Sequence, residues 1–410
     1  MFGIFGNSSF LKNKKEINTN IFKFKSFELN IKNSFKEKVG CIASFRDEEI
    51  LVGREDGILQ VTNINANKTG NIEIFKKDFD LLDNENIKEC ITAMDCTSDN
   101  SIEKTVFLAN EKNIKCIKIK ERMSVIEWMQ HSKYKNRVSL QNTTQKVFNQ
   151  QTNTNIFDKT EYESKTIFNV GCVHKYLINS ISLNVSNEFL ISSDLLKINL
   201  WKSDRLEQSF NLVDIKEKLD CGSIFVINCT KFNAYNDTVF GYCTSQGQVV
   251  LNDIKIEPKS SEICTFDVQE SRNSDNEFRM IKSISDFVFL DEYKIATRTL
   301  NNISIFDIRH TKNKLKNQEL FDVDSSIFSS DMIYEKFKIS HQNGILYTGT
   351  LTGEICVFNT NKMEFNKRKV NGIENELQIE NGIKHICIKE GTLYCANKDN
   401  IFYTRLPPNK

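Results

Sequence analysis

SSDLLKINLW, the stretch from Ser192 to Trp201, carries the clearest structural signal in this 410-residue chain. Two small residues end one strand, a polar turn follows at Asp194, and a second strand ends in an aromatic side chain. Apolar and polar residues alternate along the second strand, with the two-residue period of a β-strand that has one buried face. Such a pair of strands is typical of one blade of a β-propeller.

The same unit recurs seven times. Each copy has an apolar strand, a turn, a second strand ending in a small residue, a Gly, Asn or Asp turn, and a third strand ending in an aromatic residue or aspartate. The copies begin at Cys41, Cys90, Ile178, Ile227, Ile281, Glu335 and Ile383. Their usual spacing is about 50 residues, near the period of propeller blades. The chain is therefore predicted to be all-β, and two separate β-sandwiches are disfavoured by the even period.

The boundaries of this single seven-bladed propeller are predicted at residues 21–410, after an N-terminal extension at residues 1–20. One interval between units is much longer than the others, and its polar composition predicts an insertion at about 121–170 that leaves the plane of the blade. Phe22 to Ile31 alternates apolar and polar residues and is expected to pair with the last unit. That pairing would close the ring and remove an unpaired sheet edge.

Composition excludes several classes of partner. Lysine and arginine number 55 against 54 aspartate and glutamate, so the chain has no overall basic field for nucleic acid. No apolar run approaches the roughly 20 residues that span a bilayer, and no signal peptide is evident. The 12 cysteines are scattered without CxxC pairs and are expected to be reduced. We expect a cytoplasmic protein, with the nucleus as the alternative, and no membrane or nucleic-acid partner.

Catalytic and metal-binding motifs are not found in the sequence. The five histidines never occur in HxH or HExxH spacing, and there is no GxSxG, Walker or dinucleotide-binding motif. We therefore expect no catalytic residue, no metal and no cofactor.

The ends of the third strands, such as Leu200-Trp201-Lys202 and Ile305-Phe306-Asp307, are degenerate forms of the Trp-Asp pair of WD repeats, which predicts a WD40-type propeller. The run HKYLINSISLNVSNEFLISSDLLKINLWKSDRLEQSFNLVDI, His174 to Ile215, resembles the third-blade signature of the WD-repeat regulatory B subunit (55-kDa class) of protein phosphatase 2A. The resemblance continues in four further segments and, near the start, in FDLLDNENIKECI (Phe79 to Ile91), which is similar to the family's extended second-blade hairpin. The four segments are Ile281 to Phe289, Lys294 to Arg309, Asp331 to Phe337 and Ile345 to Asn361.

The resemblance implies a non-catalytic subunit of a heterotrimer. In that family the propeller docks on a helical-repeat scaffold subunit through the hairpin and the bottom face, and the top face presents phosphoprotein substrates to the catalytic subunit. The first alternative is a generic WD-repeat scaffold for another protein assembly. A second alternative, a propeller hydrolase, would need a cluster of metal ligands in the central channel.

The expected scaffold contacts lie in the hairpin, because large apolar residues near a hairpin tip usually mark an interface; the alternative is that they fold back onto a neighbouring blade. These residues are Phe79, Asp80, Leu81 and Leu82. The expected substrate groove includes Tyr334, which could anchor a helical motif, although it could instead cap the blade edge. The groove residues are Asp194, Leu195, Ser223, Phe278, Asp331, Tyr334 and Lys336.

Two groove positions depart from the family. The family carries two consecutive aspartates where this chain has Asp194 followed by Leu195, and it carries a leucine where this chain has Ser223. We therefore expect Leu195→Asp to increase binding to typical substrates of the family. His174, at the start of the same run, is expected to be a structural hydrogen-bonding residue.

Overall fold

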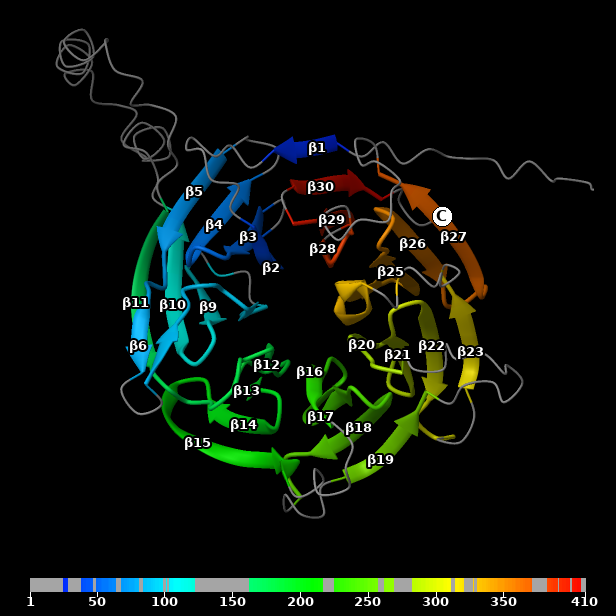
Figure 1. The fold of residues 1–410 in the computed structure, drawn as a ribbon, viewed down its shortest axis with the longest axis horizontal. Helices are drawn as coiled ribbons and strands as arrows, with labels where there is room; N and C mark the ends of the chain where they lie inside the picture. The colour runs from blue at the N-terminus through cyan, green and yellow to red at the C-terminus, as the bar shows by residue number, and fades with distance from the viewer. Residues whose placement is uncertain are drawn as a thin grey trace, which may run out of the picture.

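Seven four-stranded antiparallel sheets stand around a central axis in the computed structural model, which confirms a seven-bladed β-propeller (Figure 1). The first strand of each blade lies innermost and the fourth lies outermost. The structure describes residues 25–28, 38–46, 49–63, 68–80, 84–98, 101, 103–121, 162–216, 225–256, 262–268, 282–310, 314–320, 327, 330–370, 382–389, 391–398 and 400–406. The predicted extension at residues 1–20 lies outside these described residues.

Blades 1 to 4 follow one another along the chain. Blade 1 contains β2 (Val39–Arg46), β3 (Glu49–Arg54), β4 (Ile58–Asn63) and β5 (Lys68–Glu73). Blade 2 contains β8 (Ala93–Cys96), β9 (Glu103–Ala109), β10 (Ile114–Glu121) and β11 (Tyr162–Val170). Blade 3 contains β12 (Ser180–Leu183), β13 (Phe189–Ser193), β14 (Lys197–Lys202) and β15 (Arg205–Asp214). Blade 4 contains β16 (Ile227–Asn233), β17 (Asn236–Thr244), β18 (Gln248–Asp253) and β19 (Glu262–Asp267).

Blades 5 to 7 complete the ring. Blade 5 contains β20 (Asp286–Phe289), β21 (Lys294–Arg298), β22 (Asn302–Asp307) and β23 (Lys314–Glu319). Blade 6 contains β24 (Ile339–Gln342), β25 (Ile345–Gly349), β26 (Glu354–Asn359) and β27 (Glu364–Lys369). Blade 7 contains β28 (His385–Lys389), β29 (Thr392–Ala396), β30 (Asn400–Arg405) and β1 (Lys25–Glu28).

The two ends of the chain close the ring by pairing with each other. β1 forms the outermost strand of blade 7 and runs antiparallel to β30, with Ser26 opposite Phe402 (Figure 1). This confirms the expectation that the segment Phe22 to Ile31 pairs with the last unit. Closure means that blade 7 is built from both ends of the sequence, which ties the ring together without a special linker.

The predicted insertion is shorter than its sequence boundaries. Residues 162–170, which were expected to belong to it, form β11, and this strand pairs with β10 from Glu121 opposite Tyr162 to Ile114 opposite Val170. The segment therefore supplies the outermost strand of blade 2. Residues 122–161, the remainder of the predicted insertion, lie outside the described residues.

Antiparallel order places the loops on two faces of the ring. The turns between second and third strands and the segments that link consecutive blades lie on one face, here called the connection face. The turns between first and second strands and between third and fourth strands lie on the opposite face. Any residue in a link between blades is thus carried to the connection face by topology alone.

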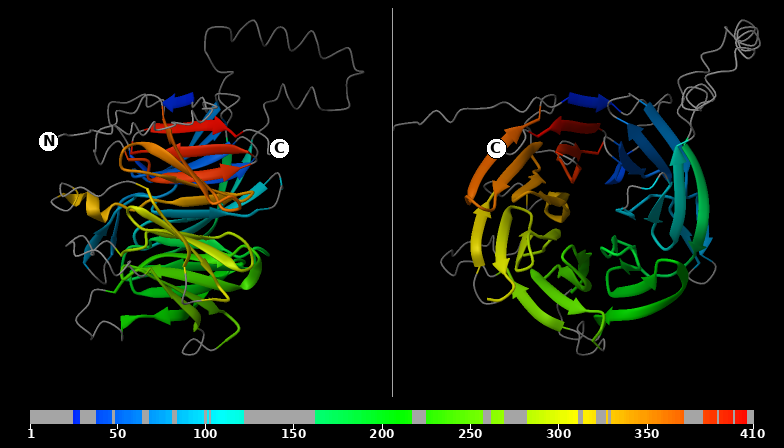
Figure 2. Two further views of the ribbon diagram at one scale, coloured as in Figure 1. Left: turned by 90° about the vertical axis from the view of Figure 1, so that its right-hand side faces the viewer. Right: turned by 180° about the vertical axis from the view of Figure 1, so that it is seen from behind.

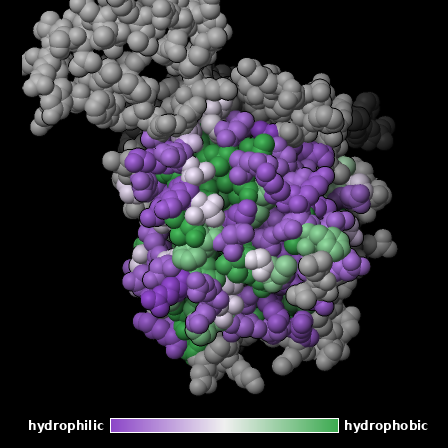
Figure 3. All heavy atoms as spheres, turned by 90° about the vertical axis from the view of Figure 1, so that its left-hand side faces the viewer, coloured by the Kyte–Doolittle hydropathy of each residue, from purple (hydrophilic) through white to green (hydrophobic). Residues whose placement is uncertain are grey.

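Apolar side chains pack between neighbouring blades. Phe107 of blade 2, for example, shares a buried cluster with Leu190 and Trp201 of blade 3. Burial of each large side chain stabilises the fold by about 1.5–3 kcal/mol. Every cysteine that the structure describes is a free thiol, as expected. The outer wall over β5 and β11 is mainly hydrophilic, with apolar side chains visible in its middle (Figure 3).

Polar contacts join the innermost strands around the axis. Asp95 of β8 accepts a hydrogen bond of 2.8 Å from the backbone N–H of Leu183 in β12. Ser180 of β12 accepts one of 2.8 Å from the backbone N–H of Thr230 in β16. These contacts set the spacing of adjacent blades where the backbones are closest. Among the described helices, none is long and apolar enough to cross a membrane.

Candidate functional site

A buried chain of four polar side chains supports the connection face at blade 3. Trp201 donates from Nε1 to Ser192 Oγ at 2.8 Å, Ser192 Oγ lies 2.7 Å from His174 Nε2, and His174 Nδ1 lies 3.1 Å from Asp194 Oδ2. Each contact has a donor and an acceptor if Ser192 donates to Nε2 and Nδ1 carries the proton that His174 donates to Asp194. His174 is therefore structural, as expected.

Asp194 belongs to this chain of contacts, which corrects its expected place in the substrate groove. Its side chain is only 1% exposed, and Oδ1 accepts hydrogen bonds of 2.7 Å from the backbone N–H groups of Leu196 and Lys197. Burial alone would raise the pKa of Asp194, but the hydrogen bonds from His174 and the two N–H groups outweigh it and lower the pKa. The carboxylate holds the turn and is not available to a substrate.

Leu195 is the neighbouring groove candidate, and it lies half-buried at the connection face. Its side chain packs against a core cluster that includes Ile191 and Leu212. Its carbonyl accepts a hydrogen bond of 2.8 Å from the N–H of Ile227, the first residue of β16. Leu195 therefore covers the junction between blades 3 and 4. Ser223 and Phe278, two further groove candidates, lie outside the described residues.

The link between blades 5 and 6 carries the most exposed aromatic side chain of those described. This link contains the 3₁₀ helix η5 (Asp331–Tyr334), which projects from the ring (Figure 2). Tyr334 is 79% exposed, so it does not cap a blade edge. Asp331 and Lys336 are exposed beside it. Three of the expected groove residues are therefore brought together on one short projection.

The base of this projection is fixed by packing and by charge. Met332 packs against a small buried cluster formed by Leu300, Ile327, Phe337 and Leu351. Glu335 forms an ion pair of 2.6 Å with Lys384 in the link before blade 7. Because both sides of the turn are anchored, Tyr334 is presented on a firm base rather than on a free loop.

A short hairpin is present where an extended second-blade hairpin was expected, but it precedes blade 2 and is not part of the sheet of that blade. It consists of β6 (Asp78–Asp80) and β7 (Glu85–Ile87), which form a separate two-stranded sheet in the link between blades 1 and 2. Phe79 is 45% exposed, in keeping with a contact residue. Leu81 and Leu82, at the tip, lie outside the described residues.

Asp80 has a structural role that the sequence did not reveal. It is 3% exposed and accepts a hydrogen bond of 2.8 Å from Lys112 Nζ in the turn between β9 and β10. The buried ion pair fastens the hairpin to blade 2. Asp80 is therefore corrected from a surface contact to an anchor, and within the described residues Phe79 alone remains of the four expected scaffold contacts.

A second exposed apolar area lies in the link between blades 2 and 3. Tyr176 is 37% exposed and Leu177 is 44% exposed. The link is joined to the hairpin's anchor, because the N–H of Val173 donates to the carbonyl of Lys112 at 3.0 Å. Sequence reasoning did not single out Leu177. The signal available in the sequence was the pair of consecutive large apolar residues, Tyr176 and Leu177, outside a predicted strand.

The connection face thus has two separate areas with exposed aromatic or apolar side chains, here called docking areas because they are the candidates for binding a partner. Phe79, Tyr176 and Leu177 lie over blade 2, and Tyr334 lies between blades 5 and 6. Both project from the same face of the ring (Figure 2). Within the described residues, no group of three His, Cys, Asp or Glu side chains could hold a metal ion.

The closed ring of seven blades, with an Asp–His–Ser–Trp chain in blade 3, defines a propeller of the WD-repeat class. No family model matches the chain. The structure resembles that of Raptor from Chaetomium thermophilum, with a TM-score of 0.57 and 10% identity over 95% of this chain and 30% of that one. At this identity the likeness shows the fold alone.

Curated relatives give the more specific similarity. The chain is 34% identical over 172 residues to a regulatory B subunit of protein phosphatase PP2A from Schizosaccharomyces pombe, covering 40% of this chain and 37% of that protein. It is 29% identical over 204 residues to the serine/threonine-protein phosphatase 2A regulatory subunit phr2AB of Dictyostelium discoideum, covering 47% and 41%. It is 30% identical over 198 residues to a PP2A regulatory B subunit from Candida tropicalis, covering 45% and 38%.

These relatives confirm the resemblance to the regulatory B subunit of protein phosphatase 2A, as a divergent relative. All three are named as regulatory subunits, not as the catalytic enzyme. The matched stretches span less than half the length of each of these relatives. Docking and substrate recruitment by this chain are therefore matters for the proposal that follows.

Proposed function

We propose that this chain is a non-catalytic regulatory subunit of protein phosphatase 2A, which docks on the scaffold subunit and recruits phosphoproteins to the catalytic subunit. The observation that carries the proposal is the presentation of Tyr334, 79% exposed on an anchored projection, in a chain whose curated relatives are PP2A regulatory subunits. An exposed aromatic on a rigid base is a typical protein-docking anchor.

The two docking areas take different roles in this proposal. The area over blade 2, formed by Phe79, Tyr176 and Leu177, contacts the scaffold, because exposed apolar groups that cluster on a surface favour a lasting protein interface. The projection with Asp331, Tyr334 and Lys336 contacts the substrate, because an aromatic flanked by both charges suits short-lived recognition of a peptide. The chemistry of phosphate removal belongs to the catalytic partner.

Co-purification of the intact chain tests the proposal. We expect a tagged protein expressed in its own cells to recover a helical-repeat scaffold and a phosphatase catalytic subunit. Phe79→Ser should reduce recovery of both, since it removes an exposed apolar contact. The matched control is Phe210→Ser, because Phe210 is 64% exposed on β15 at the outer wall. Recovery of other proteins with neither subunit, from a folded propeller, would favour a generic WD-repeat scaffold.

A further inference from the structure

The central channel contains a cavity of about 180 Å³. The innermost strand of every blade, or the link just before it, contributes at least one residue to its wall. Most of these residues are apolar or carry hydroxyl groups. Its ionisable side chains are concentrated where blades 4, 5, 6 and 7 meet: Cys229, Lys231, Asp286, Lys338 and His385.

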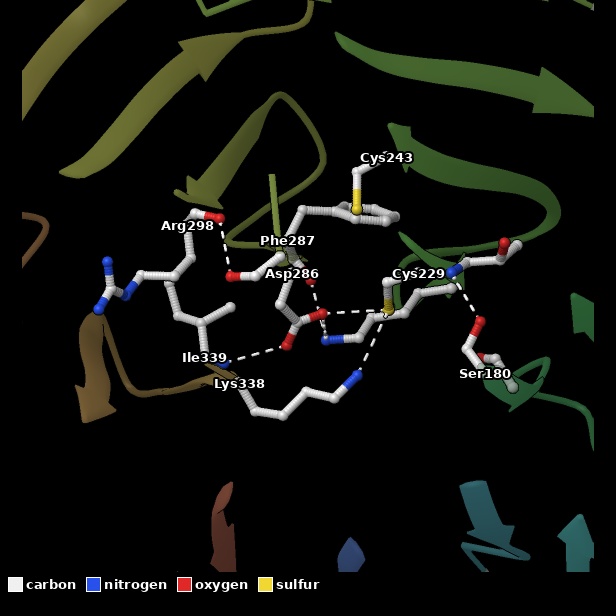
Figure 4. A network of polar contacts seen from close by, with 12 residues as sticks. Ser180, Cys229, Cys243, Asp286, Phe287, Arg298, Lys338 and Ile339 are labelled. Carbon is white, nitrogen blue, oxygen red and sulfur yellow. Dashed lines mark hydrogen bonds and ion pairs between the residues drawn. The ribbon is translucent and has the colours of Figure 1, made fainter. Parts of the chain in front are cut away.

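Lys231 and Asp286 form an ion pair with each other. Lys231 Nζ lies 2.7 Å from Asp286 Oδ1 and also donates to the carbonyl of Phe287 at 2.9 Å. Asp286 Oδ2 accepts a hydrogen bond of 3.0 Å from the N–H of Ile339 (Figure 4). Burial would raise the pKa of Asp286, but the charges of Lys231 and Lys338 outweigh it and lower the pKa. The carboxylate is therefore ionised and shared.

Lys338 has no such partner of its own. Its Nζ lies 3.8 Å from the Sγ of Cys229, and among the described residues no carboxylate is within ion-pair distance (Figure 4). Burial raises the pKa of the Cys229 thiol, so the sulfur is neutral at physiological pH and is a weak acceptor. An ammonium group has three donors, and in this wall they face the cavity largely unused.

His385 supplies a further donor at the same place. It lines the cavity, and its ring nitrogens have no hydrogen-bond partner within the part of the chain that the structure describes. Burial, together with the charges of Lys338 and Lys384, lowers the pKa of His385 to about 3. A neutral imidazole offers one N–H and one acceptor nitrogen. The lowered pKa agrees with a positive potential in the cavity.

The charges of the wall do not cancel. Lys231 and Lys338 carry two positive charges, and Asp286 carries one negative charge. Lys384, at the edge, is already paired with Glu335. An uncompensated positive charge in a partly buried site is costly and favours a bound anion. An oxyanion with several acceptor atoms would use the free donors of both Lys338 and His385.

A neighbouring cavity lies between this place and the connection face. A second cavity of about 320 Å³ shares Thr92 and His385 with the first. Its wall also includes Glu55 and Lys398, which lie at second-to-third-strand turns of blades 1 and 7 and therefore belong to the connection face. A small anion, or the end of a long modified side chain, can thus approach from outside.

We propose that the central channel binds a phosphate-class oxyanion between Lys338 and His385. The phosphate group is either free inorganic phosphate or the phosphoryl group of a phosphoserine side chain that enters from the connection face. This site is separate from the docking area over blade 2 and adjoins the base of the projection that carries Tyr334, because Lys384 pairs with Glu335 there. The inference does not depend on assembly with a phosphatase.

Binding to the full-length chain tests the site. Isothermal titration and the thermal unfolding midpoint are measured with inorganic phosphate, with a phosphoserine peptide, and with chloride at matched ionic strength. We expect phosphate to bind and to raise the midpoint beyond the chloride effect. Lys338→Met should weaken binding about tenfold to a hundredfold, because it removes a charge-assisted contact but keeps the length of the side chain.

Two further variants make the result decisive. Lys362→Met removes the same charge from an exposed turn on the opposite face and should bind phosphate as the wild type does. Lys338→Arg keeps the charge and should retain most of the affinity, which guards against a Lys338→Met variant that fails to fold. If inorganic phosphate binds and the phosphoserine peptide does not, the ligand of the site is a free anion. If both bind, the ligand is a phosphorylated side chain. Equal affinity in Lys338→Met and wild type, or no binding beyond chloride, would overturn the proposal.

Discussion

Lys112 Nζ lies 2.8 Å from Asp80 Oδ2, and both side chains are almost fully buried. This ion pair joins the turn between β9 and β10 to the hairpin formed by β6 and β7. The exposed Phe79 is adjacent to Asp80 in the hairpin. The position of the exposed Phe79 is thus set by a buried ion pair of its neighbour in the hairpin.

Breaking this pair should destabilise the fold and loosen the hairpin. Lys112→Ala leaves the carboxylate of Asp80 buried, and loss of one partner of a buried pair costs about 3–5 kcal/mol. Urea unfolding followed by circular dichroism measures the loss. Lys88→Ala is the control, because Lys88 pairs with Glu111 at 3.2 Å while mostly exposed, and such pairs contribute less than about 1 kcal/mol. Equal losses in the two variants would contradict the anchoring role.

Tyr334→Ala should weaken capture of phosphoprotein substrates by roughly tenfold to a hundredfold, since burying a large side chain contributes about 1.5–3 kcal/mol. Recovery of the scaffold and catalytic subunits should stay unchanged, because Tyr334 lies away from the hairpin. Tyr293→Ala is the control, since Tyr293 is also exposed but lies on the opposite face, in the turn between β20 and β21. Weaker substrate capture by both variants, or unchanged capture by both, would show that Tyr334 has no specific role in substrate binding.

Leu195→Asp should increase binding to typical substrates of the B-subunit family, because it restores the second of two consecutive aspartates at the connection face. Leu195 is half-buried, so a modest loss of stability is expected as well. Peptide binding measured by fluorescence anisotropy separates the two effects. Asp194 is buried and engaged, so it does not already provide this charge. Unchanged affinity would mean that the groove recognises different substrates.

Ionisation of the carboxyl group of Asp95 should lower the free energy of unfolding as the pH rises. It lies on the innermost strand β8, where burial of its carboxyl group raises its pKa to about 6 from an ordinary 3.8. Because the pKa is raised in the folded state, the stabilising contribution is fully present below about pH 4 and is lost as the pH rises through 6. We therefore expect the free energy of unfolding of Asp95→Asn, relative to wild type, to rise across this window by on the order of 2 kcal/mol.

Asp194→Asn provides the matched comparison, because the pKa of Asp194 is lowered. Its carboxylate contributes stability above about pH 4 that is lost as the pH falls. The free energy of unfolding of this variant relative to wild type should therefore fall as the pH rises, opposite to Asp95→Asn. Urea unfolding at about pH 4 and pH 7 checks Asp95→Asn, and unfolding at about pH 2 and pH 5 checks Asp194→Asn, because the stabilisation by Asp194 is lost below about pH 4. Parallel behaviour of the two would show that their environments do not differ as described.

Local sequence was sufficient for the three inner strands of the blades and for ring closure, but the repeat as read from the sequence did not include the fourth, outermost strands. Apolar and polar residues alternate in segments such as Lys197 to Lys202 because one face of the strand is buried. This pattern can be read directly from the sequence. The pairing of β1 with β30 was also predictable, because the alternating segment Phe22 to Ile31 precedes the first unit and an unpaired sheet edge would otherwise remain. β11 was missed because a long polar segment separates it from β10.

The candidate site was only partly predictable. The exposure of Tyr334 agrees with its expected role, but Asp194 and Asp80 were misassigned as surface contacts. Each of these aspartates has a partner far away in the sequence, namely His174 and Lys112. A carboxylate in a turn has the same sequence signature whether it faces solvent or a distant side chain.

The sequence by itself determined the all-β repeat, the number of blades and the likeness to a phosphatase regulatory subunit, because these depend on short patterns along the chain. Only the tertiary structure decided which polar residues are buried anchors and which are offered to a partner. It also brought Lys231, Asp286, Lys338 and His385 together in one channel. These residues come from four blades, and only closure of the ring brings the innermost strands of those blades within contact distance.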